Sequence, residues 1–225
     1  MPVLAYILTA LAAYLLGSIP TGFLVAKAKG IDIRSVGSGN IGATNAMRVL
    51  GKPAGIFVLL MDAAKGYAAC FLGVIIYIHY FYQFYGLHPA SAYPPCASQE
   101  VAERFATIAG IFAVLGHNYT CWLKFKGGKG IATTAGVYLA LAPWAVLVGL
   151  VIFILAVLIT KYVSVGSIAA AIALPVTVWI MTPQNLFLGI VSTALGVLAI
   201  YKHKTNIQRL MAGTENRLRQ KKETK

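Results

Sequence analysis

Acidic residues are scarce in this chain, in which Asp and Glu together number 6 of 225 residues against 19 Lys and Arg. Charged residues of every kind make up only 11% of the sequence, whereas hydrophobic residues make up 59%. So little polar surface cannot cover a water-soluble domain. The composition therefore excludes that class and predicts an all-α membrane protein that crosses the bilayer several times.

Metal and disulfide chemistry also lack the residues that they require. The three cysteines, Cys70, Cys96 and Cys121, fall in an expected span, an outer loop and an inner loop, so they form no disulfide framework. No spacing of His, Cys, Asp or Glu indicates a metal site. No His is followed five residues later by Asp, as in the common glycerolipid acyltransferases, and a Ser-His-Asp triad has no obvious members. We expect no metal, no cofactor, no nucleic acid and no obligate protein partner.

Seven apolar runs predict seven transmembrane helices, at 3–26, 54–84, 105–119, 131–142, 144–160, 165–181 and 185–201. The run 131–142 is short for a hydrocarbon core of about 30 Å, so it is either a short span that turns at Pro143 or the start of one long kinked helix over 131–160. With seven spans every basic cluster lies on one side of the membrane, which favours the first alternative. By the positive-inside rule this side is the cytoplasm, so the N-terminus is expected outside and the C-terminus in the cytoplasm.

The spans are expected to form a single domain over residues 1–203, followed by a basic cytoplasmic tail over 204–225. The tail is predicted to begin as a short amphipathic segment and then to become disordered. The outer loop 83–100, rich in Pro, Ser and aromatic residues, is assigned no chemistry. No internal repeat is visible, which disfavours a transporter built from two symmetric halves.

Residues suited to binding anions concentrate in four segments that this topology places in the cytoplasm, 30–52, 116–136, 161–171 and 201–215. Each segment combines Gly or Ser, which let the backbone approach a ligand, with a nearby cation and a hydroxyl or amide group. We expect the four segments to meet at one face of the membrane and to form an anion site there. Part of the formal charge of +13 reflects only topology and attraction to anionic lipid.

The first segment contains "GSGNIGATN" over residues 37–45. Gly37, Gly39 and Gly42 permit tight turns and positive φ angles, which aim several backbone N–H groups at one anion. Arg48 can hold a phosphate through two hydrogen bonds. Further donors are the side chains of Ser38, Asn40, Thr44 and Asn45.

The second segment repeats this arrangement in "FKGGKG", where Lys126 and Lys129 flank Gly127 and Gly128. A helix expected from Ile131 would present its N-terminal amides and its dipole to the same anion. The other two segments contribute polar side chains near the ends of spans, namely Ser164, Ser167, His203, Asn206, Arg209 and Glu215.

Each segment alone has a simpler interpretation. A Gly-rich loop beside basic residues can be only a turn, and neither "GSGNIG" nor "FKGGKG" has the strand context of a dinucleotide fold or a P-loop. His117 can be a structural hydrogen bonder. Ser164 and Ser167 can cap a helix, and His203 and Lys204 can lie at the interface with their polar ends in water. Four such segments on one face together favour an anion site.

Asp62 and Lys65 stand apart from these segments, about two turns inside the second expected span. They lie three residues apart and therefore share one helix face. Charge inside a membrane is costly and commonly functional. The alternative is a pair that neutralises itself and orients the helix.

Four stretches carry a family resemblance: "GSIPTGFLVAKAKGIDIRSVGSGNIGATNAMRVLGK", "GHNYTCWLKFKGGKGIAT", "SVGSIAAA" and "HKTNIQRLMAGTE". They resemble the motifs of the bacterial acyl-phosphate:glycerol-3-phosphate acyltransferase family (PlsY). The resemblance covers all but the outer loop and the end of the tail. The sequence departs from the family locally, in "NYTCW", which lacks a proline found in some relatives, and in a longer outer loop.

The resemblance implies a seven-span enzyme of the bacterial inner membrane with its active site at the cytoplasmic face. Such an enzyme transfers a fatty acyl group from acyl phosphate to sn-glycerol 3-phosphate, giving lysophosphatidic acid and phosphate, the first acylation step of phospholipid synthesis. The catalytic residues implied are Ser38, Arg48, Lys129 and His203. The substrate-binding residues implied are Gly37, Gly39, Asn40, Gly42, Asn45, His117, Lys126, Gly127, Gly128, Ser164, Ser167, Asn206, Arg209 and Glu215.

The residues agree with this chemistry, because a site rich in cations and amides but poor in bases suits substrates that bring their own charge and activation. An oxygen of the donor phosphate would accept the proton of the attacking hydroxyl. The competing hypothesis makes His117 or His203 the base. Two other functions stay open at this point: a membrane transporter of a phosphorylated small metabolite, which would need polar residues across to the outer face, and a non-catalytic binder of lipid head groups.

Overall fold

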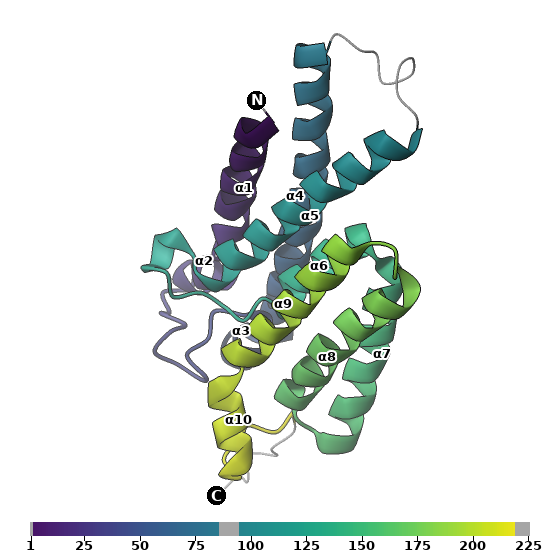
Figure 1. Cartoon of the computed structure of the whole chain (residues 1–225). Helices are drawn as coiled ribbons and strands as arrows, with labels where there is room; N and C mark the ends of the chain where they lie inside the picture. Colours follow the sequence, from purple (N-terminus) through teal and green to yellow (C-terminus); the bar gives the residue numbers. More distant parts are fainter. Residues whose placement is uncertain (1, 86–94, 219–225) are drawn as a thin grey trace, which may run out of the picture. The chain divides into compact units, whose positions relative to one another are not determined.

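Helices make up most of the chain in the computed structural model, which describes residues 2–85 and 95–218 (Figure 1). No strand occurs in these described residues, so the predicted all-α fold is confirmed. The chain folds as two compact units, Met1–Leu141 and Ala142–Lys225. The helices are α1 Pro2–Ser18, α2 Thr21–Lys27, α3 Ala43–Leu50, α4 Lys52–Tyr85, α5 Pro95–Asn118, the 3₁₀ helix η1 Cys121–Leu123, α6 Ile131–Leu141, α7 Pro143–Thr160, α8 Val163–Met181, α9 Leu186–Lys202 and α10 Lys204–Met211.

Several helices are long and apolar enough to cross a bilayer. By length and composition they number four within the described residues: Val3–Lys27, which joins α1 to α2, Lys52–Tyr80, Pro143–Thr160 and Val163–Met181. The pair α9 and α10, bent by 52°, makes a fifth if the two count as one span. α6 is apolar but shorter, and the early turns of α5 carry Glu100, Glu103 and Arg104. Seven spans and their orientation therefore stay predictions.

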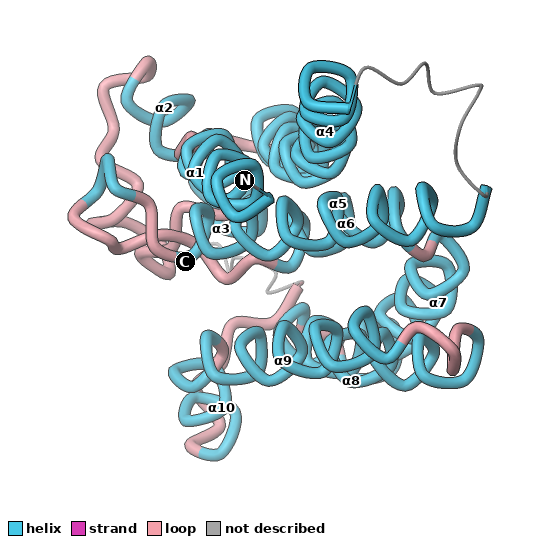
Figure 2. Tube along the Cα trace, turned by 45° about the horizontal axis from the view of Figure 1, so that its top comes forward, coloured by secondary structure: helices cyan, strands magenta, loops and turns pink. Residues whose placement is uncertain are grey.

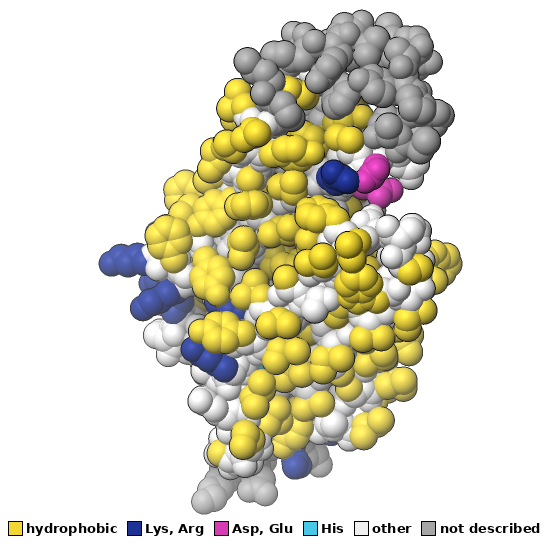
Figure 3. Space-filling model, viewed as in Figure 1, with side chains coloured by type: hydrophobic (Ala, Val, Ile, Leu, Met, Phe, Trp, Pro, Cys, Tyr) yellow, Lys and Arg dark blue, Asp and Glu magenta, His cyan; other side chains and the backbone are white. Residues whose placement is uncertain are grey.

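Hydrophobic side chains face outward along these helices, and in Figure 3 they cover most of the visible face. On α7 the exposed residues include Leu147, Leu150, Val151, Leu155, Leu158 and Ile159. Water would penalise such a surface, whereas lipid tails solvate it. The outer loop 83–100 lies largely, and the tail 204–225 partly, outside the residues whose placement is described.

Glycine lets helices of the first unit cross with their backbones in contact. A Cβ on Gly17 of α1 would overlap the carbonyl of Ala113 in α5, and one on Gly136 of α6 would overlap the carbonyl of Ala63 in α4. Small residues at crossings are the usual basis of close helix association in membranes. α5 consequently packs along α1 and α4, which also contact each other (Figure 2).

The first apolar run is interrupted. α1 ends at Ser18, because Pro20 has no N–H to continue the helix and its ring crowds the preceding turn. The backbone carbonyls at this break accept hydrogen bonds from side chains. Thr120 Oγ1 donates to Ser18 O, and Lys65 Nζ donates to Ile19 O at 2.9 Å. The break thus supplies acceptors inside the first unit.

The stretch 131–160 forms two helices. α6 ends at Leu141, and Ala142 has φ −153° and ψ 73°, which interrupts the helical backbone. Pro143 follows at the start of α7, where its missing N–H is not needed. Residues 131–160 are therefore not one uninterrupted helix, and whether they cross the membrane once or twice stays a prediction.

In the second unit α8 packs against both α7 and α9. A Cβ on Gly196 of α9 would lie 2.7 Å from the carbonyl of Ala171 in α8, so these backbones also approach closely. α7 ends at Thr160, and the next residue, Lys161, has a φ of 65° that turns the chain into α8. α9 ends at Lys202, and α10 follows after the bend at His203.

Candidate functional site

The loop of residues 28–42 connects α2 to α3, and the side chain of Asn45 holds it from inside. Asn45 Oδ1 accepts a hydrogen bond from Ser38 N at 2.8 Å. Asn45 Nδ2 donates to Val36 O at 3.1 Å and to Ile33 O at 3.3 Å. The residue is only 1% exposed, so its carboxamide serves the loop itself.

Glycine is required at two points of this loop. Gly37 and Gly39 have φ of 62° and 71°, in the left-handed region that favours glycine. A Cβ on Gly37 would also overlap Asn45 Oδ1. Gly42 differs from the expected positive φ, because it caps α3 with φ −80° and ψ 171°. Its N–H donates to Asn40 Oδ1 at 2.8 Å, which closes an Asx turn before the helix.

An exposed ion pair, which sequence reasoning missed, braces the start of the loop. Arg34 donates to Asp32 from Nε at 2.9 Å and from Nη2 at 2.7 Å, and its guanidinium lies 4.9 Å from the centre of the Phe23 ring. The hydrogen bonds from Arg34 lower the pKa of Asp32 to about 2, so this carboxylate is ionised at neutral pH. Arg34 is thereby engaged with Asp32. Arg48 lies in the last turn of α3 and is exposed.

The "FKGGKG" loop runs back along the end of α5. Gly127 N donates to Asn118 O at 3.2 Å, and Gly128 N donates to His117 O at 3.0 Å. A Cβ on Gly127 would overlap the His117 carbonyl, and a Cβ on Gly128 would overlap the His117 ring. Only glycine fits at these two points. On either side, Lys126 is exposed and Lys129 is half-buried.

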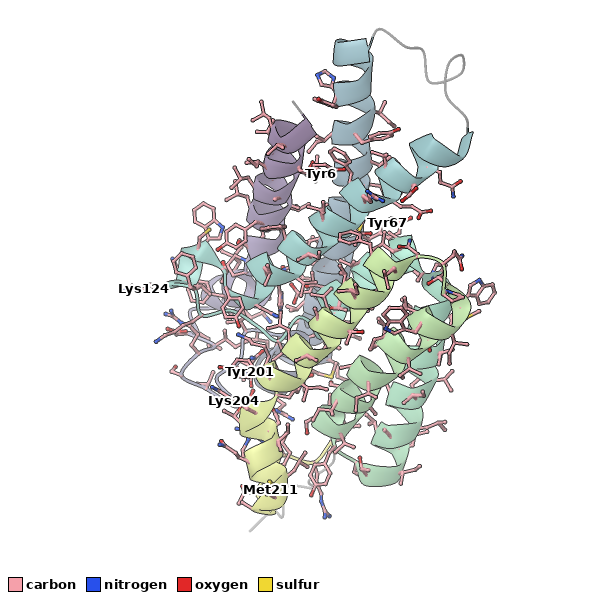
Figure 4. The ribbon with its side chains drawn as sticks, viewed as in Figure 1. Tyr6, Tyr67, Lys124, Tyr201, Lys204 and Met211 are labelled. Carbon is pink, nitrogen blue, oxygen red and sulfur yellow. The ribbon has the colours of Figure 1, made fainter. Side chains whose placement is uncertain are left out.

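The segment before this loop presents aromatic residues outward. Trp122 and Phe125 are 65% and 63% exposed, and Lys124 between them has a left-handed φ of 54°. Figure 4 shows Lys124 at the outer edge of the first unit. Exposed aromatic residues beside a lysine are typical of the membrane–water interface.

A hydrophobic cluster joins the first two motifs. Ile33 and Ile41 of the first loop and Ala46 of α3 share a buried cluster with Leu123 of η1. The segments that carry Arg48 and the two lysines therefore rest on one core within the first unit. Together they offer an anion cations, backbone amides and hydroxyls. In the described part of the chain, no three His, Cys, Asp or Glu side chains are grouped as metal ligands.

Asp62 and Lys65 form the ion pair that their spacing predicts. Lys65 Nζ lies 2.9 Å from Asp62 Oδ1, and the two residues are 6% and 2% exposed. His117 Nδ1 lies 3.6 Å from the same Oδ1. Sequence reasoning missed this third member, because His117 is on another helix and no spacing rule links it to α4.

Glu215 organises the C-terminal motif within the second unit. Asn206 Nδ2 donates to Glu215 Oε1 at 2.7 Å, and Arg209 Nε donates to Glu215 Oε2 at 2.9 Å. His203, at the bend before α10, places Nδ1 2.7 Å from Ala199 O. Lys204 lies nearby, with Nζ 4.8 Å from the ring of Tyr201 (Figure 4).

The tail stays in contact with the second unit for several residues after α10. Residues 212–218 fold back, because the buried Glu215 bonds to α10 and Leu218 N donates to Lys161 O at 2.9 Å. These contacts bring the third and fourth motifs together in the second unit. Residues 219–225 lie outside the described part of the chain.

Ser164 and Ser167 lie inside the first turns of α8 and are each 6% exposed. Ser167 Oγ donates to Val163 O at 2.9 Å. The helix is preceded by Tyr162, which makes no capping bond through its side chain. The capping interpretation of the two serines is therefore wrong.

Comparison with known proteins decides the family. The family model described as glycerol-3-phosphate acyltransferase matches residues 7–213. The chain belongs to the glycerol-3-phosphate acyltransferase family. The predicted resemblance is therefore confirmed at the level of the family.

Relatives named glycerol-3-phosphate acyltransferase match nearly the whole chain. The protein from Geotalea daltonii is 42% identical over 206 residues, which cover 92% of this chain and 94% of the relative. The protein from Geobacter sulfurreducens is 43% identical over 215 residues, which cover 95% of this chain and 97% of the relative.

Solved structures of PlsY, described as an integral membrane glycerol 3-phosphate acyltransferase, have the same fold. The glycerol 3-phosphate form gives a TM-score of 0.77 at 35% identity, with 94% of each chain covered. The lysophosphatidic acid form gives a TM-score of 0.74 with the same identity and coverage. With its apolar helices, this member of the acyltransferase family is a multi-pass membrane protein.

Proposed function

We propose that this chain transfers a fatty acyl group from acyl phosphate to sn-glycerol 3-phosphate, giving 1-acyl-sn-glycerol 3-phosphate and phosphate. The observation that carries the proposal is the pair of glycine loops joined through Leu123, with Arg48 beside one loop and Lys126 and Lys129 on the other. The family and the likeness to the glycerol 3-phosphate form of PlsY support the acceptor. The proposed acyl donor is acyl phosphate, because a site with few bases favours an acyl compound that is already activated and charged.

The residues act mainly by neutralising and aligning the substrates. An acyl phosphate and glycerol 3-phosphate together carry roughly four negative charges. Arg48, Lys129 and Ser38 would hold them with the loop amides, and the family resemblance also implies roles for His203 and Asn206. Once the charges are balanced, the hydroxyl attacks in what is effectively an intramolecular step.

The chemical step needs no protein base. The hydroxyl oxygen of glycerol 3-phosphate forms a bond to the acyl carbon, the bond from that carbon to the phosphate oxygen breaks, and the hydroxyl proton passes to an oxygen of the departing phosphate. His117 is buried against Gly128, which suits support better than proton transfer. His203 keeps Nδ1 at hydrogen-bonding distance from Ala199 O, so Nε2 is the nitrogen that the competing hypothesis would use.

The membrane arrangement is part of the proposal. Seven spans, with the N-terminus outside and the C-terminus in the cytoplasm, would put every glycine loop and basic cluster on the cytoplasmic side of the inner membrane. The acyl chain would then stay in the bilayer while its phosphate reaches the cations.

One assay tests the function. Purified protein is mixed with labelled glycerol 3-phosphate and either palmitoyl phosphate or palmitoyl-coenzyme A, and labelled lysophosphatidic acid is measured. We expect product with palmitoyl phosphate and none with the thioester, because the sequence carries no motif that predicts a nucleotide-binding fold. Arg48→Ala serves as the inactive control, since one lost preorganised donor costs about 10²–10³ in rate. Turnover with the thioester alone would contradict the proposed donor, and no turnover with either would contradict the function.

A further inference from the structure

A buried polar cluster behind the "FKGGKG" loop has no part in the proposed chemical step. It consists of Asp62 and Lys65 on α4 and His117 at the end of α5, which are 2%, 6% and 5% exposed. Asp62 Oδ1 lies 2.9 Å from Lys65 Nζ and 3.6 Å from His117 Nδ1. The carboxylate therefore contacts nitrogen atoms from two helices.

The cluster is anchored at the break between α1 and α2. Lys65 Nζ donates to Ile19 O at 2.9 Å. Close by, Tyr14 OH of α1 donates to Tyr119 O at 2.7 Å, just beyond the end of α5. The charged pair on α4 thus bonds to the break between α1 and α2 through the lysine and faces α5 through the carboxylate.

The same cluster supports the turn at Gly127 and Gly128. His117 O accepts the hydrogen bond of Gly128 N at 3.0 Å, and a Cβ on Gly128 would overlap Nε2 of the His117 ring. The ring is therefore packed between the Asp62 carboxylate and the backbone of Gly128. A rotation of this ring would displace the backbone that carries Lys126 and Lys129.

A pair that only neutralises itself would need no partner outside α4. Burying two charges costs more than their attraction returns unless further polar groups complete their contacts. Here two groups of other elements face the pair: the Ile19 carbonyl accepts from Lys65, and the His117 ring lies 3.6 Å from Asp62 Oδ1. One of them directly supports the glycine turn, which connects the buried charge to the loop.

We infer that the Asp62–Lys65–His117 cluster positions the Gly127–Gly128 turn, so that Lys126 and Lys129 meet the phosphate of glycerol 3-phosphate. The three residues act through the turn and are positioning residues. The inference rests on the proposed function. It gives the Asp62–Lys65 pair a functional role, whereas the alternative was a pair that only neutralises itself.

The first test removes both charges at once, in Asp62→Asn/Lys65→Met, so that no single buried charge is left unpaired. We expect the KM for glycerol 3-phosphate to rise about tenfold, which is typical when a residue that orients a ligand-binding residue is removed. The value of kcat should fall less, and the KM for palmitoyl phosphate should be unchanged. The control is Glu100→Gln/Arg104→Met, which removes an exposed ion pair from α5 and should leave both KM values unchanged. A folded variant of the buried pair with the wild-type KM for glycerol 3-phosphate would overturn the inference.

The second test leaves the ion pair intact and compares two replacements of the histidine. Asn at position 117 puts its amide near the place of Nδ1, facing Asp62, whereas Gln puts it near the place of Nε2. We expect the KM for glycerol 3-phosphate to be lower in His117→Asn than in His117→Gln. Equal KM values, or a lower value for His117→Gln, would overturn the inference. Wild-type turnover, measured alongside, separates either result from a failure of the proposed function.

Discussion

At the scale of the residue, Asn45 determines the shape of the first glycine loop. Its carboxamide accepts from Ser38 N and donates to the carbonyls of Ile33 and Val36, all inside the protein. Amino-acid type alone identified Asn45 as a hydrogen-bond donor for an anion. The contacts instead favour a residue that prepares the loop for the anion.

Replacing Asn45 by Ala should therefore lower stability and activity together. A buried polar group left unpaired costs about 1–3 kcal/mol, and the loop amides lose their alignment, so we expect kcat/KM to fall about 10²–10³-fold. Thermal unfolding and initial rates in detergent measure both effects. Gln99→Ala, at an exposed position on α5, is the control and should resemble the wild type. A stable, fully active Asn45→Ala protein would contradict this role.

The proton route is tested at His203. If the donor phosphate takes the proton, His203→Gln should lower kcat/KM by about 10²–10³, as for one lost donor, and should keep the shape of the pH profile. Phosphate groups titrate near pH 6, so the acidic limb belongs to the substrates. The measurement is kcat/KM for glycerol 3-phosphate across the neutral range. Loss of the acidic limb in the variant would identify His203 as the base.

At the scale of the element, glycines decide how closely helices approach. A Cβ on Gly136 of α6 would overlap the Ala63 carbonyl of α4, whereas the nearest atom to a Cβ on Gly149 of α7 is Ala170 O at 4.0 Å. The two glycines have similar sequence surroundings, since both lie within apolar helices. Only the packing distinguishes them.

These two positions give a matched pair of variants. Gly136→Ala should force α4 and α6 apart and lower the free energy of unfolding by about 1–3 kcal/mol, the usual cost of overpacking. Gly149→Ala should be neutral or stabilising by up to about 1 kcal/mol, because Ala is the better helix former. Unfolding of both proteins in the same detergent checks the difference. Equal stability of the two variants would show that the α4–α6 crossing can relax.

At the scale of the whole molecule, the topology can be tested by accessibility. In a protein whose three native cysteines are replaced, we introduce one cysteine at exposed Gln99 or at exposed Lys126. With intact spheroplasts, a membrane-impermeant thiol reagent should label position 99 and should label position 126 only after permeabilisation. Labelling of both positions from the same side of the membrane would contradict the seven-span proposal.

Much of the fold follows from the sequence, because hydropathy alone marks α4, α7 and α8 as candidate spans. The break after Ser18 is the exception, since an apolar run reads as continuous even where Pro20 interrupts the helix. The fold-back of residues 212–218 was also missed. It depends on one buried carboxylate, which composition cannot distinguish from a solvated one.

The candidate site divides in the same way. Glycines and cations form local patterns in the sequence, so Gly37, Gly39 and the "FKGGKG" loop can be predicted from it. Contacts between distant segments leave no such pattern. The contact of His117 with Asp62 and the shared cluster of Leu123 with Ile33 could not be predicted.

The break between α1 and α2 also links two distant positions in evolution. In an uninterrupted helix each carbonyl accepts the amide four residues ahead, so Ile19 O would be engaged within its own helix. At the break that Pro20 imposes, that carbonyl instead accepts from Thr21 N at 3.1 Å and from the ammonium of Lys65 at 2.9 Å. Without the proline, the ammonium of Lys65 would lose this acceptor. Without the lysine, selection to keep a proline at position 20 would be weaker. Among relatives, we expect substitutions at positions 20 and 65 to occur together.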